Sequence, residues 1–210
     1  MLPHRSAAVG SFLLLAAGTL GAAEPPALSN VRHIDARTPR DVQMALALAA
    51  GPPVSGGAAV YVLGPKGYEK AREGTNGFSC LVERERTDTM EPECYDAEGT
   101  ATTLKVRFFV EQERALGKDE ARIESAVAEG YKSGRFAAPR KAGIVYMLSD
   151  YNYVFDPGAK QIIHFPGHLM FYAPYATAKD IGEGPGAPYL TAPGQPDNVM
   201  VVIPAGSHAH

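Results

Sequence analysis

A predominantly apolar stretch near the amino terminus limits which part of this chain builds the fold. Residues 7–20 follow a short start that carries His4 and Arg5, and small residues occupy 21–23. This is the three-part pattern of a secretory signal peptide. The stretch is shorter than the roughly 18–20 residues that a membrane-spanning helix needs. We therefore predict a signal peptide over residues 1–23 and a folded part with no membrane span.

Two cysteines, Cys80 and Cys94, are present. Export places them in an oxidising compartment, where an isolated pair usually bonds. A disulfide here closes a loop of about 15 residues, which in the chain-entropy model stabilises the fold by about 3 kcal/mol. The alternative is a metal site or a reactive thiol, although the spacing fits no CxxC pattern. The pattern predicts an exported bacterial protein, periplasmic or secreted, with one disulfide bond.

The composition is that of an ordinary globular protein, with 45% hydrophobic and 20% charged residues. The net charge of −3 and the lack of any basic block argue against binding of nucleic acid. The length of 210 residues suits one domain. We expect a flexible leader over 24–37, a single domain over 38–205 and a tail over 206–210.

Local patterns predict the elements of the first half of that domain. A helix begins at Thr38-Pro39 and ends before Gly51. Strands are expected at 58–63, 68–72 and 78–82, joined as one β-meander whose last turn is Asn76-Gly77. The segment 104–116 alternates like a strand but has the composition of a helix, and we favour a helix over 102–115. A second helix, capped by Asp119, completes a hairpin through Gly117.

The last third is rich in β-type and aromatic residues. Strands are expected at 143–149, 151–155, 161–165, 168–172 and 199–203, with a long loop over 182–196. The fold class is therefore α+β: a mainly antiparallel β-sheet with a helical hairpin inserted between two strand-rich halves.

No strong catalytic motif occurs: there is no HExxH, P-loop, GxSxG or EF-hand loop. The richest region in imidazole, phenol and carboxyl groups runs from Tyr146 to Asp180. His168 precedes an apolar strand and needs a hydrogen-bond partner, which Asp150 or Tyr172 would supply. Such a pair is a candidate general base for a hydrolase-like or lyase-like enzyme, and equally a structural hydrogen bond.

Two other interpretations use the same region. Aromatic and imidazole side chains are candidates for lining a ligand pocket, although such residues more often form core; they are Tyr146, Tyr151, Tyr153, His164 and Tyr175. A metal site would use His164, His168 and Met170. However, Pro166-Gly167 lies between the two histidines and breaks a helix, and a two-residue hairpin at this point would turn the two rings to opposite faces of the sheet. Neither geometry readily brings both rings to one metal ion. We predict no cofactor.

Several segments resemble a group of exported bacterial proteins without an assigned activity. They are Glu73-Gly74-Thr75-Asn76-Gly77-Phe78-Ser79-Cys80, Pro92-Glu93-Cys94, Gly130-Tyr131-Lys132-Ser133-Gly134, Tyr146-Met147-Leu148-Ser149 and Met170-Phe171-Tyr172-Ala173-Pro174-Tyr175. The resemblance implies an exported single domain and carries over no catalytic residue. The leading hypothesis is an exported soluble protein of unknown activity that binds a small molecule or a protein partner through its aromatic, His-containing C-terminal sheet. Whether it is an enzyme stays open, and a role without catalysis is favoured.

Overall fold

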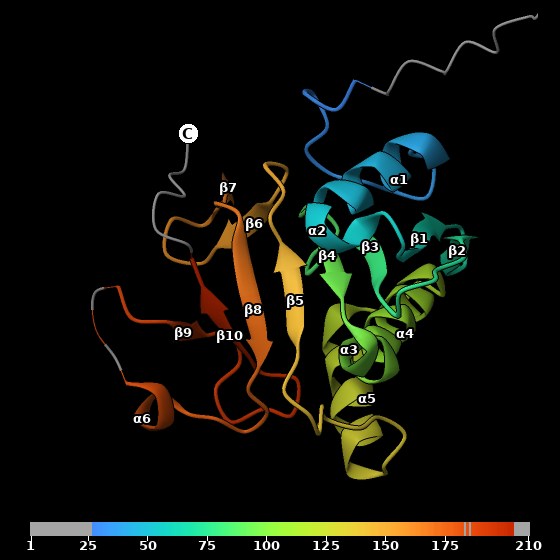
Figure 1. Ribbon diagram of the computed structural model, residues 1–210. Helices are drawn as coiled ribbons and strands as arrows, with labels where there is room; N and C mark the ends of the chain where they lie inside the picture. Colours follow the sequence, from blue (N-terminus) through green and yellow to red (C-terminus); the bar gives the residue numbers. More distant parts are fainter. Residues whose placement is uncertain (1–26, 183, 185, 204–210) are drawn as a thin grey trace, which may run out of the picture.

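The computed structural model describes residues 27–182, 184 and 186–203 (Figure 1). The predicted signal peptide over 1–23 and the tail over 206–210 lie outside the described residues. Among the residues that the structure describes, no helix is long and apolar enough to cross a membrane.

An eight-stranded mixed sheet, in the order β2-β1-β3-β4-β5-β8-β10-β9, forms the centre of the molecule. Its strands are β1 (Ala59–Gly64), β2 (Gly67–Arg72), β3 (Ser79–Glu83), β4 (Glu91–Tyr95), β5 (Ile144–Met147), β8 (His168–Tyr172), β9 (Tyr189–Leu190) and β10 (Val199–Val202). A separate hairpin consists of β6 (Tyr153–Asp156) and β7 (Gln161–His164). The chain therefore combines helices with a large mixed sheet.

The first three strands do not form the expected meander, because β3 runs parallel to β1. Strand β2 ends beside Val60 and β3 begins beside Ala59, on the opposite side of β1. The connecting segment crosses the start of β1, where Thr75 N donates to the Gly57 carbonyl at 2.7 Å and Ala59 N to that of Phe78 at 2.8 Å. The Asn-Gly turn is thus part of a crossing loop, not of a hairpin.

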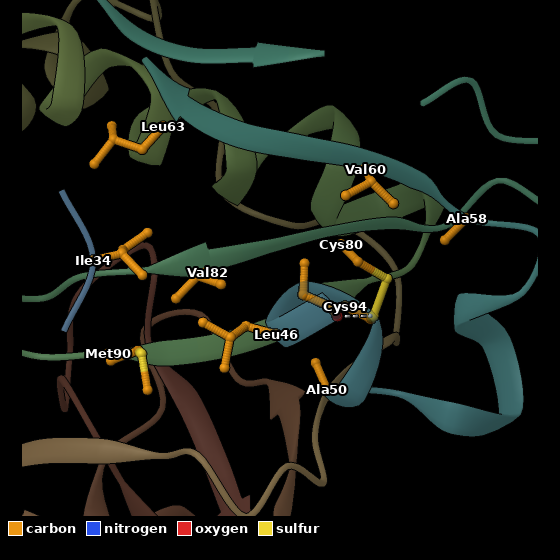
Figure 2. Packing of buried hydrophobic residues seen from close by; sticks show 11 residues of the cluster. Ile34, Leu46, Ala50, Ala58, Val60, Leu63, Cys80, Val82, Met90 and Cys94 are labelled. Atoms are coloured by element: carbon orange, nitrogen blue, oxygen red, sulfur yellow. Dashed lines mark hydrogen bonds between the residues drawn. A yellow bond between two sulfur atoms is a disulfide. The ribbon is translucent and has the colours of Figure 1, made fainter. Parts of the chain in front are cut away.

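One face of the sheet packs on helix α1 (Arg40–Ala49), which is followed by the short α2 (Pro52–Ser55). Leu46 and Ala50 lie against the Cys80–Cys94 disulfide, which joins directly opposite residues of β3 and β4 (Figure 2). The predicted disulfide is confirmed. Ile34 is fully buried in the same cluster, so the expectation of a flexible leader is wrong for that part of 24–37.

The opposite face packs on α4 (Thr103–Ala115) and the short α3 (Ala97–Ala101), and α5 (Glu120–Lys132) packs against α4. All three helices lie between β4 and β5 in the sequence (Figure 1). The segment with the ambiguous pattern is α4, so the helix expected there is confirmed. Helix α5 is capped as predicted, since Asp119 accepts a hydrogen bond from Arg122 N at 2.9 Å.

All five strands expected in the last third are present. The Pro166-Gly167 turn does not make a hairpin: β7 pairs with β6, whereas β8 pairs with β5 and β10. The long loop expected over 182–196 contains β9, and the short helix α6 (Ala178–Ile181) lies just before it. The β6–β7 hairpin is attached to the sheet through Met90, whose backbone exchanges two hydrogen bonds with Tyr153.

Candidate functional site

The face of the sheet opposite α1 contains a cavity of about 610 Å³, here called the sheet cavity. Its floor is apolar and comes from the C-terminal strands: Val145, Met147, Met170, Val199 and Val201. The β6–β7 hairpin supplies Phe155 and Ile163, and β9 supplies Tyr189. Its polar wall is made by β3, β4 and α4, with Glu83, Glu91, Glu93, Tyr95, Thr103 and Arg107.

A second cavity of about 580 Å³, the helix cavity, lies against α4 and α5. It shares Glu83, Glu85, Arg107 and Asp197 with the sheet cavity, so the two are neighbours. Tyr175 also lines the helix cavity; it is largely exposed and has a positive φ of 64°.

The polar wall brings three glutamates together. Glu83 of β3 lies directly opposite Glu91 of β4, and Glu93 follows on the same face of β4. Like charges that face each other across two strands destabilise a sheet unless protons or cations neutralise them. Protons or positive groups must therefore balance this part of the wall.

Glu83 has its own partners. Arg107 Nε lies 2.6 Å from Glu83 Oε1, and the Tyr95 hydroxyl donates to Glu83 Oε2 at 2.6 Å. The single guanidinium on this wall is therefore already engaged. Its charge compensates Glu83 and leaves the two carboxyl groups of β4 without a cation of their own.

The two glutamates of β4 hold their protons more tightly than ordinary carboxyl groups. Burial, with Glu83 adding a like charge, raises the pKa of Glu91 to about 8. Burial raises the pKa of Glu93 well above its ordinary value, again with Glu83 contributing. Glu93 is only 4% exposed, and its Oε2 makes no hydrogen bond among the described residues. The Thr103 hydroxyl is likewise buried and unpartnered there. Glu93 and Thr103 both belong to the residues that line the sheet cavity.

The raised pKa values predict that the protein loses stability as the pH rises. The folded state binds these protons more tightly than the unfolded chain, so the free energy of unfolding falls between about pH 4.5 and pH 8. Each proton involved contributes up to about 1.4 kcal/mol per pH unit. Thermal unfolding at pH 5, 6.5 and 8 measures this slope.

The control for that slope is the double variant E91Q/E93Q, which keeps the side-chain size and removes both titrating groups. We expect a flatter profile for it, whereas E129Q, on the exposed face of α5, keeps the wild-type slope. Equal slopes in the wild type and the double variant would show that these carboxyl groups titrate normally.

His168 lies in the floor of the sheet cavity and is 3% exposed. Its Nδ1 hydrogen-bonds the Pro166 carbonyl at 2.9 Å, so Nδ1 carries the proton. Burial lowers the pKa of His168, which keeps the ring neutral near pH 7. The partner expected from the sequence is replaced: Asp150 is exposed, and its contact is with His164, whose Nε2 lies 2.9 Å from the Asp150 carbonyl.

Tyr172 is the other expected partner of His168, and it has a structural role instead. Its hydroxyl donates to Asp96 Oδ1 at 3.0 Å. The same carboxylate caps α3 through Gly99 N and accepts from Ile144 N, so it joins α3, β5 and β8. The proposed catalytic pairs of His168 with Asp150 or Tyr172 are therefore wrong in this structure.

Most of the aromatic residues expected to line a pocket lie elsewhere. Tyr146, Tyr151 and Tyr153 pack on the core beneath α1, and His164 pairs with Tyr153 in the β6–β7 hairpin. None of these four lines either cavity, whereas Tyr175 lines the helix cavity. The reason is the alternation of β5, which sends Tyr146 to the α1 face and Val145 and Met147 to the cavity face.

The metal interpretation finds no cluster to support it. His168 and Met170 both line the sheet cavity, but His164 belongs to the other sheet. Among the described residues, no group of three or more His, Cys, Asp or Glu side chains is arranged to hold a metal ion.

The carboxyl wall was missed in the sequence, although a signal for it existed. Glu91, Glu93 and Tyr95 alternate with Pro92 and Cys94 along β4. Because Cys94 forms a buried disulfide on one face, the residues on either side of it must point to the other face.

Comparisons with known proteins add nothing: no family model, curated protein or solved structure matches this chain.

Proposed function

We propose that this is an exported protein whose function is to bind a small molecule in the sheet cavity. The observation that carries the proposal is Glu93, which lines the cavity and whose buried Oε2 has no hydrogen-bond partner among the described residues. An unsatisfied buried polar atom destabilises a fold by about 1–3 kcal/mol. A ligand that donates a hydrogen bond to it would remove that penalty.

The dimensions and chemistry of the sheet cavity support this proposal. Ligand pockets usually enclose about 300–1,000 Å³ and combine an apolar lining with a few polar groups. The sheet cavity has about 610 Å³, an apolar floor and one polar wall. The proposed ligand site includes the C-terminal strands through Met147, Met170 and their neighbours, and not through Tyr146, Tyr151 or Tyr153.

Export is part of the proposal and has two supports. The residues before position 24 have the pattern of a signal peptide. The cysteines form a disulfide, which is typical of oxidising compartments outside the cytoplasm. The final location, periplasm or extracellular medium, is part of the same proposal.

A thermal-shift screen against a broad library of small molecules tests the binding function. We expect hits that raise the melting temperature, since a ligand at a hundred times its Kd stabilises the folded state by about 2.7 kcal/mol. The variant A192W places a large side chain at the edge of the sheet cavity and should abolish the shift given by these hits.

The matched control is A138W, which alters a half-buried alanine that lines neither cavity. It should retain the wild-type response. Hits that survive in A192W would place the ligand elsewhere, and a library without any hit would contradict the proposed function.

A further inference from the structure

The sheet cavity has an excess of acidic groups. Its described lining includes six carboxyl groups, Glu83, Glu85, Glu91, Glu93, Asp156 and Asp197, but only one permanent cation, Arg107. Arg107 is paired with Glu83. The cavity is thus electrostatically incomplete, and it favours a ligand that brings positive charge.

The positions of the unpaired groups define where that charge would lie. Glu91 and Glu93 are two residues apart on one face of β4, and the Thr103 hydroxyl and Glu93 Oε2 are both buried without partners among the described residues. An ammonium group has three donors and no acceptor. Its donors match carboxylate and hydroxyl oxygens, and a charge-assisted hydrogen bond to a carboxylate is about twice as strong as a neutral one.

The apolar floor of the sheet cavity indicates the chemistry of the rest of the ligand. The floor formed by Val145, Met147, Met170, Val199 and Val201 has no charged group. His168 adds no charge, because burial keeps its ring neutral. An alkyl or aryl body fits this surface through the hydrophobic effect.

We propose that the sheet cavity binds a small primary amine with an apolar body, whose ammonium group lies against Glu91 and Glu93. This inference rests on the proposed function and specifies its ligand class. An anionic ligand is disfavoured because the one guanidinium of the wall is already engaged. A metal ion is disfavoured because the described residues form no cluster of ligating side chains suited to one.

Binding of an amine is then coupled to release of protons from the wall. In the empty site, burial favours the protonated forms of Glu91 and Glu93, and an ammonium group displaces these protons because it favours the ionised carboxylates. The titratable or charged groups around these two carboxyl groups, from all the surrounding elements, are Glu83, Glu85, Tyr95, Arg107, Asp156, His168, Tyr189 and Asp197. Only Arg107 is positive, so the protons are the main compensating charge that the ligand replaces.

Isothermal titration calorimetry at pH 6, 7 and 8 tests the proposal with 2-phenylethylamine and hexylamine as probes. Both amines stay protonated over this range, since alkylammonium groups titrate near pH 10. The uncharged counterparts 2-phenylethanol and hexanol serve as controls. We expect the Kd of at least one amine to fall by up to about tenfold per pH unit for each proton released, and the alcohols to bind more weakly without this dependence.

Single substitutions test whether the ammonium group binds at Glu93. E93Q preserves the shape of the side chain and should weaken amine binding by about tenfold or more, as expected for loss of a hydrogen bond to a charged group. E129Q, on the exposed face of α5, should leave binding unchanged. Circular dichroism of each variant verifies that it is folded before titration.

The outcomes separate this inference from the proposed function. If amines and alcohols bind equally at every pH, the cavity binds ligands but the inference about charge is wrong. The inference about charge is also wrong if neither series binds while the library screen yields other ligands whose binding is abolished in A192W. If neither series binds and the screen is silent, both the ligand class and the binding function are wrong.

Discussion

Replacing Glu111 by glutamine will lower the free energy of unfolding by about 3–5 kcal/mol, the range for breaking a buried ion pair. Glu111 is 4% exposed and lies between two arginines. Its Oε2 accepts from Arg84 Nη2 at 2.5 Å, and its Oε1 accepts from Arg114 Nη1 at 2.7 Å. The two arginine side chains are each 9% exposed. Without the carboxylate, two buried positive charges would face each other.

The position of this triad explains why the effect extends beyond one contact. Arg84 also donates to the Ile34 carbonyl at 3.2 Å, and Arg114 donates to the carbonyls of Arg84 and Glu85 at 2.8 and 2.6 Å. Helix α4, the end of β3 and the amino-terminal segment are thus held together by the same charges. Urea unfolding of the wild type and of E111Q measures the difference.

The matched control is E120Q. Glu120 also bonds to Arg114, with Oε1 2.8 Å from Nε, but it is 54% exposed. Exposed ion pairs contribute about 0–1 kcal/mol, so E120Q should differ little from the wild type. A loss in E111Q no larger than that in E120Q would mean that the triad is not a buried network.

Reduction of the Cys80–Cys94 disulfide will lower the free energy of unfolding by about 3 kcal/mol. The two cysteines are 14 positions apart, and both are fully buried beneath α1. Because the sulfur atoms are enclosed in the folded protein, the chain should be unfolded, reduced and refolded in the presence of reductant. Urea unfolding of the reduced and oxidised forms gives the difference.

The variant C80A/C94A separates loss of the cross-link from other effects of the reductant, since its stability should not respond to reductant. Native protein purified from an exported fraction should contain no free thiol. Equal stability of the oxidised and reduced forms would contradict a stabilising role for the cross-link, and two free thiols in the native protein would contradict its formation.

Much of the candidate site could not be predicted from local sequence. The region from Tyr146 to Asp180 is rich in phenol and imidazole groups, yet Tyr146 of β5, Tyr153 of β6 and Tyr151 of the turn between them all pack on the α1 core. His168 does line the sheet cavity, as does Met170. The carboxyl wall opposite them comes from β3 and β4, far earlier in the chain. The high frequency of phenol and imidazole groups in one stretch of sequence therefore indicated the side of the sheet cavity that His168 and Met170 line, and gave no indication of the carboxyl wall.

The sequence by itself determined most of the longer helices and strands of this protein and its cross-link, but it gave no expectation of β4 or α3. The helices α4 and α5, the short strands and the disulfide follow from periodicity, caps and cysteine spacing, which act between residues close in the chain. Only the tertiary structure decided that β3 runs parallel to β1, that β7 pairs with β6 and not with β8, and that Glu83 faces Glu91. Strand order and register depend on which surfaces bury one another, and no local stretch of sequence contains that information.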